Sequence, residues 1–215
     1  MRIGIDLGGT KTEGLLLGDD GSEHRVRIAS ARSYAGTLDV VSGLVARLDE
    51  RAGRRCTVGV GTPGSISPTT GLVRNANSTW LEGHPLDRDL SARLARPVRV
   101  SNDANCFALS EAVDGAAAGS ETVFGVILGT GVGGGVVVRG IPLCGPNAIA
   151  GEWGHNPLPW PDDAERPGPD CYCGKRGCIE AFLSGPGLAA DHERVTGARR
   201  SPEEIVLRTE SGDPE

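Results

Sequence analysis

The chain has 215 residues, of which 38% are hydrophobic and 4% aromatic, with 33 glycines and a formal net charge of −6 at pH 7. This length allows one large domain or two small ones with a real core. The acidic charge disfavours nucleic acid and anionic membranes as partners, and no apolar run could cross a bilayer. Because no charged start leads into an apolar signal core, we expect a cytoplasmic protein.

The first half of the chain alternates predicted strands with predicted helices. Short apolar segments bounded by turn residues predict strands at residues 2–7, 12–17, 23–28, 57–60, 72–73 and 98–100. Apolar residues at helical spacing predict helices at residues 37–52, 86–94 and 105–118. The opening hairpin and the alternation that follows are typical of an α/β layer.

An Ala-Gly-Ser hinge at residues 118–120 separates two predicted domains, which cover residues 1–118 and 119–215. The second domain opens with another hairpin, whose strands are predicted at residues 123–128 and 135–138. A glycine-rich turn joins these two strands. The second domain is therefore predicted to begin, like the first, with a hairpin whose turn is rich in glycine.

The first hairpin carries a candidate phosphate loop. Asp6 ends the first strand, and Gly8, Gly9, Thr10 and Lys11 form the turn. Glycines expose backbone amides that can hold phosphate oxygens, and the aspartate can orient Mg²⁺ or its waters. This is not a Walker loop, because GxxxxGK[ST] is absent and a strand follows instead of a helix. Taken alone, a glycine-rich hairpin with one solvated aspartate is the alternative.

The second hairpin carries a turn of the same kind, in which the candidate phosphate-binding residues are Gly129, Thr130, Gly131 and Gly133. Two such loops in two domains can clamp a triphosphate from both sides. Together they predict ATP between the domains.

A third candidate motif joins a predicted strand to a predicted helix at Asn102 and Asp103. Either residue would ordinarily be a helix cap. The functional interpretation is that Asp103 accepts the proton of a substrate hydroxyl as it attacks the γ-phosphate, while Asn102 holds a neighbouring hydroxyl. Both roles can coexist, since different residues can supply the cap and the base.

Four side chains form a complete set of zinc ligands: His155, Cys171, Cys173 and Cys178. One imidazole and three thiolates suit a closed tetrahedral site, and four protein ligands leave no position for a water, so we expect structural zinc. The alternative is that the thiols are merely buried and the histidine lies on a surface loop. The other three cysteines, Cys56, Cys106 and Cys144, are interpreted as ordinary, mostly buried thiols.

Two acids lie within the same motifs as the metal ligands, Glu152 beside His155 and Glu180 beside Cys178. Loops fixed by a metal could hold these carboxylates in place to grip a polar ligand such as a sugar. Glu152 as a solvated acid and His155 as a sugar ligand are alternatives that the sequence leaves open.

These motifs, in this order, resemble the ROK family of sugar kinases, repressors and uncharacterised reading frames. The resemblance rests on residues 6–11, 102–105, 129–135, 151–155 and 171–180. It implies the actin-like ATPase (ribonuclease H-like) α/β fold, with two domains and a cleft, and it implies ATP, Mg²⁺ and structural Zn²⁺ as cofactors. By the same resemblance, Asp103 is the general base, and the sugar contacts are Asn102, Glu152, His155 and Glu180. The zinc ligands implied are His155, Cys171, Cys173 and Cys178.

Within the family, residues 62–68, 75–81 and 155–160 look most like bacterial fructokinases of mannokinase type. This implies phosphorylation of the primary hydroxyl of fructose, and also of mannose, with N-acetylglucosamine kinase and glucokinase as near alternatives. Members are commonly dimers, which makes a homodimer one expected assembly. The family's repressors carry a winged helix-turn-helix ahead of the first loop, and a loop that starts at Asp6 leaves no room for one.

Family members continue beyond the position of Glu215, through a segment that holds adenosine and a final helix that returns to the first domain. We therefore expect the second domain to be incomplete, with apolar surface uncovered and with low stability or association as the result. The favoured explanation is a fragment or interrupted reading frame of a kinase. The alternative is a natural short form, a zinc-stabilised sugar-binding module without turnover.

Overall fold

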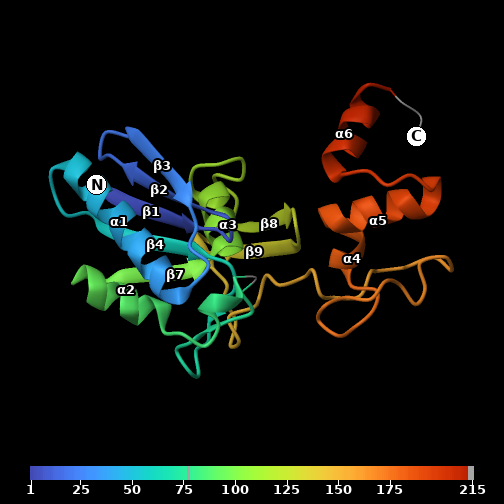
Figure 1. The fold of residues 1–215 in the computed structure, drawn as a ribbon, viewed down its shortest axis with the longest axis horizontal. Coiled ribbons are helices and arrows are strands. Elements are labelled where there is room, and N and C mark those ends of the chain that lie inside the picture. Colours follow the sequence, from blue (N-terminus) through green and yellow to red (C-terminus); the bar gives the residue numbers. More distant parts are fainter. Residues whose placement is uncertain (77, 213–215) are drawn as a thin grey trace. The chain divides into compact units, whose positions relative to one another are not determined.

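A computed structural model of the chain describes residues 1–76 and 78–212 (Figure 1). Asn77, in a loop that resembles fructokinases, and residues 213–215 of the expected polar tail lie outside the described residues. The chain divides into two compact units: unit 1 is Met1–Phe107 with Cys144–Ala150, and unit 2 is Ala108–Leu143 with Gly151–Glu215. Each unit is described by itself, and the functional domain boundary near residue 118 stays a prediction.

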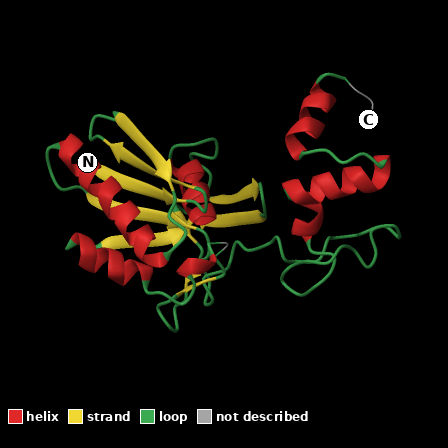
Figure 2. Cartoon of the chain, in the orientation of Figure 1, coloured by secondary structure: helices red, strands yellow, loops and turns green. Residues whose placement is uncertain are grey.

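Unit 1 is built on a five-stranded sheet of order β3-β2-β1-β4-β7 (Figure 2). Its strands are β1 (Arg2–Leu7), β2 (Lys11–Leu17), β3 (Glu23–Ala29), β4 (Thr57–Thr62) and β7 (Val98–Asn102). The first three strands form an antiparallel meander, whereas β4 runs parallel to β1 and β7 parallel to β4. The predicted opening hairpin is confirmed, and the carboxyl ends of β1, β4 and β7 share one edge.

Two helices cover one face of this sheet, α1 (Tyr34–Ala52) and α2 (Leu86–Leu94) (Figure 1). The prediction for α2 is confirmed, and α1 begins earlier than predicted because Ser33 caps it, accepting a hydrogen bond from the Gly36 amide at 3.2 Å. The short elements between β4 and α2 are β5 (Ser65–Ile66), β6 (Val73–Arg74) and a 3-10 turn (Thr79–Leu81). The core combines the inward residues of β1 and β4 with apolar residues of both helices: Ile3, Ile5, Val41, Leu44, Leu48, Val58, Val60, Leu86 and Leu90.

Helix α3 (Asp103–Val113) follows β7 directly. The sequence predicted it over residues 105–118. It begins sooner because Asn102 caps it, accepting a hydrogen bond from the Asn105 amide. It ends sooner because the amides of Asp114 and Gly115 both bond to the Ser110 carbonyl, which closes the last turn.

Unit 2 contains a three-stranded antiparallel sheet of order β10-β9-β8, made of β8 (Thr122–Leu128), β9 (Val132–Val138) and β10 (Ile141–Pro142). The predicted second hairpin is confirmed, with β9 starting earlier than expected. Three apolar residues on one face of β8 are exposed, and they form apolar surface that no other described element covers: Phe124, Val126 and Leu128. Low stability or association through that surface stays a prediction.

Three helices of unit 2 were not anticipated: α4 (Ile179–Leu183), α5 (Gly185–Thr196) and α6 (Pro202–Glu210). Ser184 caps α5, and a reciprocal capping box of Ser201 and Glu204 starts α6. Among the helices described here, none has the length and apolarity to cross a membrane.

Candidate active site and metal centre

Asp6 and Asp103 lie at the same edge of the sheet in unit 1, at the carboxyl ends of β1 and β7, which flank β4. Asp6 pairs in register with Gly61 of β4, and Gly61 pairs with Ser101 of β7, two residues before Asp103 starts α3. A Cβ placed on Gly61 would lie 3.8 Å from the Asp103 Cα, so the missing side chain keeps this corner open. Ligands of open α/β sheets bind at this edge, where parallel strands end.

The charge of Asp103 acts on the carboxyl group of Asp6. Although the Asp6 side chain is accessible to solvent, desolvation by the surrounding protein raises its pKa above the ordinary aspartate value, and the charges of Asp103 and Glu13 add to the rise. The positive charge of Arg27 offsets this rise only in part. Closely placed carboxylates with little compensating positive charge form a hard oxygen donor set of the kind that Mg²⁺ prefers.

Ser30 fixes the first glycine loop. Its amide donates to the Thr10 carbonyl at 3.0 Å, and its hydroxyl donates to the Gly8 carbonyl at 2.7 Å. The Gly8 amide in turn donates to the Lys11 carbonyl at 3.1 Å, and a Cβ on Gly8 would come within 2.7 Å of that oxygen. The turn therefore requires glycine at this position, and Ser30 is a loop anchor that the sequence reading missed.

Of the two candidate residues Asn102 and Asp103, Asn102 is the one that caps helix α3. Its Oδ1 accepts from the Asn105 amide at 3.1 Å, and its Nδ2 donates to the Gly64 carbonyl at 3.1 Å. Asp103 is partly exposed and accepts from the Ala104 amide at 2.8 Å through one carboxylate oxygen. The capping interpretation is confirmed for Asn102, while its sugar contact stays a prediction.

The second glycine turn, in unit 2, is held from one side by a buried acid. The Val132 amide donates to Oε2 of Glu180 at 2.8 Å, and Glu180 is only 8% exposed. A Cβ on Gly131 would lie 2.7 Å from the same oxygen, so this glycine lets the carboxylate approach. The Gly185 amide, at the start of α5, donates to the Gly129 carbonyl at 2.8 Å. Strand β9 and helices α4 and α5 together set the shape of the turn.

Four predicted metal ligands converge in unit 2: the ligand atoms of His155, Cys171, Cys173 and Cys178 all lie within 4.8 Å of one another. Nδ1 of His155 is 3.5 Å from the Cys171 sulfur, and the sulfurs of Cys173 and Cys178 are 3.6 Å apart. Tetrahedral zinc with usual bond lengths would place N–S and S–S pairs about 3.5 and 3.8 Å apart. The donor set and its spacing therefore fit zinc.

The two metal-binding segments are tied together by their main chains. The Glu180 amide donates to the Gly154 carbonyl at 2.8 Å, and the Ile179 amide donates to the Asn156 carbonyl at 2.9 Å. These bonds hold the start of α4 against the segment that carries His155. Glu152, the other predicted sugar contact, is exposed at the edge of this frame.

The hydroxyl of Tyr172 also reaches this frame, at 3.0 Å from Nε2 of His155. Although 77% of the residue is exposed, desolvation near the hydroxyl and the negative charge of Glu180 raise the pKa of Tyr172 to about 12. The sequence reading missed this residue, and its only signal was its place between two cysteine ligands.

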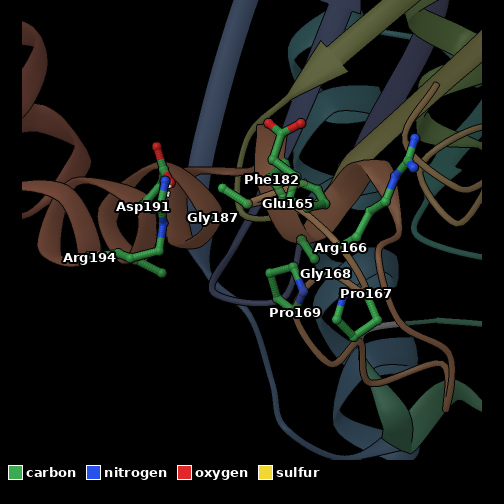
Figure 3. Close-up of a pocket in the computed structure, with 12 residues that line it drawn as sticks. Glu165, Arg166, Pro167, Gly168, Pro169, Phe182, Gly187, Asp191 and Arg194 are labelled. Atoms are coloured by element: carbon green, nitrogen blue, oxygen red, sulfur yellow. Dashed lines mark hydrogen bonds and ion pairs between the residues drawn. The ribbon is translucent and has the colours of Figure 1, made fainter. Parts of the chain in front are cut away.

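A separate pocket of about 330 Å³ lies in unit 2 between the loop at residues 164–169 and helices α4 and α5 (Figure 3). Phe182 and prolines of the loop form its apolar wall, and the ion pair of Arg194 with Asp191, 2.6 Å apart, lies at its rim. None of the predicted site residues lines it.

Of the thiols predicted to be mostly buried, Cys56 is buried, but Cys106 and Cys144 are exposed, which corrects that expectation.

Each unit thus brings one group of predicted residues together: the acids and the first loop in unit 1, and the second loop, Glu180 and the metal ligands in unit 2. This arrangement is that of an α/β protein with a candidate small-molecule site and a candidate metal centre. A family model described as the ROK family matches residues 2–215. The chain belongs to the ROK family.

Known proteins extend this result. An N-acetyl-D-glucosamine kinase from Salmonella gallinarum is 44% identical over 223 aligned residues, which cover 99% of this chain and 72% of that protein. The crystal structure of a ROK hexokinase from Thermus thermophilus matches with a TM-score of 0.83 at 32% identity, covering 99% of this chain and 70% of that one. A ROK family glucokinase from Streptomyces griseus, in complex with glucose and AMPPNP, matches with a TM-score of 0.76 at 28% identity, covering 99% and 72%. The expected actin-like ATPase fold is confirmed.

Proposed function

We propose that this protein transfers the γ-phosphoryl group of ATP to a hydroxyl of a hexose, with N-acetyl-D-glucosamine as the first candidate. The observation that carries the proposal is the placement of Asp6 and Asp103 at the same edge of the sheet, at the carboxyl ends of β1 and β7 on either side of β4, where the charge of Asp103 acts on Asp6. One carboxylate can take the proton of the attacking hydroxyl while the other lies where a phosphate-bound cation is needed.

Asp103 is the proposed general base. It is partly exposed at the start of α3, and one of its oxygens is held by the Ala104 amide, which orients the carboxylate. Phosphoryl transfer requires little covalent chemistry from the protein, so most of the rate enhancement comes from positioning and charge stabilisation. When bound, Mg²⁺ would neutralise charge on the phosphates, and Asp6 is the residue proposed to orient it.

The proposed phosphate contacts are residues of the two glycine turns: Gly8, Gly9, Thr10 and Lys11 in unit 1, and Gly129, Thr130, Gly131 and Gly133 in unit 2. Each turn is anchored from outside, by Ser30 in unit 1 and by Glu180 in unit 2. Amides fixed before the ligand arrives lose little entropy on binding it.

The choice of sugar departs from the fructose preference that the loops predicted. The comparisons do not support that preference, because the Salmonella relative is named for N-acetyl-D-glucosamine and the two solved structures for hexokinase and glucokinase. Glu152, His155, Glu180 and Asn102 remain the proposed sugar contacts. Fructose, mannose and glucose become the competing substrates in the test.

The metal centre has a structural role in this proposal. His155, Cys171, Cys173 and Cys178 would hold zinc with no remaining position for water, and the ion would fix the segments that carry Glu152 and Glu180. Burial raises the pKa of Cys178 to about 12, so metal binding would displace a proton from this thiol.

The variant Asp103→Asn tests the proposed base. It should lower kcat by about 10²–10⁴-fold, because general base catalysis is worth that much, while sugar affinity measured by calorimetry changes little. Asp114→Asn is the matched control, since Asp114 is exposed beyond the end of α3. Unchanged turnover in Asp103→Asn would remove this residue from the mechanism.

A further inference from the structure

The three cysteine ligands of the candidate metal centre differ in their access to solvent. Cys173 is exposed and Cys171 is half-buried, whereas Cys178 is only 1% exposed. The sulfurs of Cys173 and Cys178 are nevertheless 3.6 Å apart. A thiol that solvent can reach therefore contacts one that solvent cannot reach.

A closed turn holds the exposed sulfur in this place. The Cys171 amide donates to the Lys175 carbonyl at 2.9 Å, and the Gly174 amide donates to the Cys171 carbonyl at 3.0 Å. Cys173 lies within this turn, and Cys178 is the residue directly before helix α4. Because the turn is closed by its own main-chain hydrogen bonds, the approach of the two sulfurs does not depend on a bound metal alone.

Two sulfurs at this separation can become a disulfide after a small movement. The bond is about 2.0 Å long, so the sulfurs of Cys173 and Cys178 have to approach by roughly 1.6 Å. The other pair within the turn, Cys171 and Cys173, is separated by a single residue, and so short a ring strains the preferred disulfide geometry. The Cys171 sulfur faces Nδ1 of His155 at 3.5 Å. Cys173 with Cys178 is therefore the favoured pair.

We propose that Cys173 and Cys178 are a modification site, which hydrogen peroxide converts into a reversible disulfide with release of the metal. This inference rests on the metal centre of the proposed function. A metal keeps its sulfur ligands as thiolates, the form that reacts with peroxides. Solvent access sets the order of the steps: the exposed Cys173 meets the oxidant first, and the buried Cys178 reacts second.

The two steps balance in atoms and electrons. The Cys173 thiolate attacks one oxygen of hydrogen peroxide, the O–O bond breaks and hydroxide leaves, which gives a sulfenic acid. The Cys178 thiolate then attacks that sulfur, the S–S bond forms, the S–O bond breaks and a second hydroxide leaves. The two sulfurs lose two electrons in total, the peroxide is reduced, and two protons from solvent convert both hydroxides into water.

The disulfide takes away two of the four converging ligands of the candidate metal centre. The remaining ligands, His155 and Cys171, are too few to retain zinc in a tetrahedral site. Structural zinc contributes folding free energy, and a disulfide across so short a loop constrains the unfolded chain only weakly. Oxidation should therefore lower the unfolding temperature, and a dithiol with added Zn²⁺ should restore it.

The experiment treats the zinc-loaded protein with hydrogen peroxide, follows zinc release with a chromophoric chelator and locates the disulfide by peptide mapping. An untreated sample with the same chelator sets the background. The wild-type protein should lose its zinc together with two reactive thiols and show a link between Cys173 and Cys178. The matched control combines Cys106→Ser with Cys144→Ser, which removes the other exposed thiols of the described chain. It should release zinc as the wild-type protein does.

Several outcomes would overturn the modification site and leave the metal centre standing. They are zinc that stays bound after peroxide treatment, zinc release that disappears in the control variant, a link between any other pair of cysteines, and Cys173 oxidised beyond the sulfenic acid without a link. A wild-type protein that binds no zinc would overturn both. Zinc release and thiol pairing are measured without ATP or sugar, so a failure of the catalytic proposal stays distinguishable.

Discussion

The negative charge of Asp103 acts on Asp6, because the two residues lie at the carboxyl ends of β1 and β7, two strands of one sheet that both run parallel to β4 between them. The ionised form of Asp6 is further disfavoured by desolvation, so the folded protein holds this proton more tightly than the unfolded chain does. A group of this kind lowers stability where it is ionised, which is a common property of functional sites.

The variant Asp6→Asn should therefore be more stable than the wild-type protein at pH 7. The raised pKa means that Asp6 favours folding below the unfolded value of 3.8 and loses that contribution as pH rises through the folded pKa. The stability difference between variant and wild type should thus grow as pH rises from about 4 and then level off. Urea unfolding over a pH series measures it.

Glu13→Gln is a control variant whose stability should change in the opposite direction. Hydrogen bonds from Arg27 and Arg25 lower the pKa of Glu13, so its contribution is present above the unfolded value of 4.5 and is lost as pH falls. This variant should be less stable than the wild-type protein at pH 7. An Asp6→Asn protein that is also destabilised at pH 7 would contradict the account of Asp6.

Gly131→Ala should destabilise unit 2 by about 1–3 kcal/mol, the cost of leaving a buried hydrogen-bonding group unpaired. The added Cβ would lie 2.7 Å from Oε2 of Glu180 and would force the carboxylate away from the Val132 amide. Gly129→Ala is the matched control in the same turn, because its Cβ would meet nothing within 4 Å. Its effect should stay within about 0.5 kcal/mol. Equal effects of the two variants in thermal unfolding would count against the tight fit at Gly131.

Cys173→Ser should lose bound zinc, whereas Cys144→Ser should keep it. Cys173 contributes one of four converging ligand atoms, and Cys144 is an exposed cysteine outside that group. Elemental analysis of the purified proteins measures the difference, and a chelator should lower the unfolding temperature of the wild-type protein. Zinc retained in Cys173→Ser at the wild-type ratio would refute the ligand assignment.

Much of unit 1 could be predicted because its signals are local. The hairpin of β1 and β2 follows from two short segments with apolar residues on either side of a glycine turn, and the helix signal of α2 is complete in its own residues. The convergence of the metal ligands could be predicted as well, since four residues of suitable chemistry lie in two short segments.

The structural features that the sequence did not predict were missed for two different reasons. Helix α6 has a local signal, the capping box of Ser201 and Glu204, from which the helix could have been predicted. Ser30 could not be found in this way, because its partner, the Gly8 carbonyl, is distant in sequence and carries no pattern that points to it. Tyr172 lies between two predicted metal ligands, but its contact with His155 depends on how the two metal-binding segments fold together.

The most direct test of the proposed activity is sugar-dependent ADP release by the purified, zinc-loaded protein with MgATP. N-acetyl-D-glucosamine, glucose, mannose and fructose are compared at equal concentration, with Asp103→Asn as the inactive reference. The account predicts turnover that requires a hexose, is fastest with N-acetyl-D-glucosamine and falls to background in Asp103→Asn. ADP release that no hexose raises above background, from protein that still binds N-acetyl-D-glucosamine in calorimetry, would contradict it.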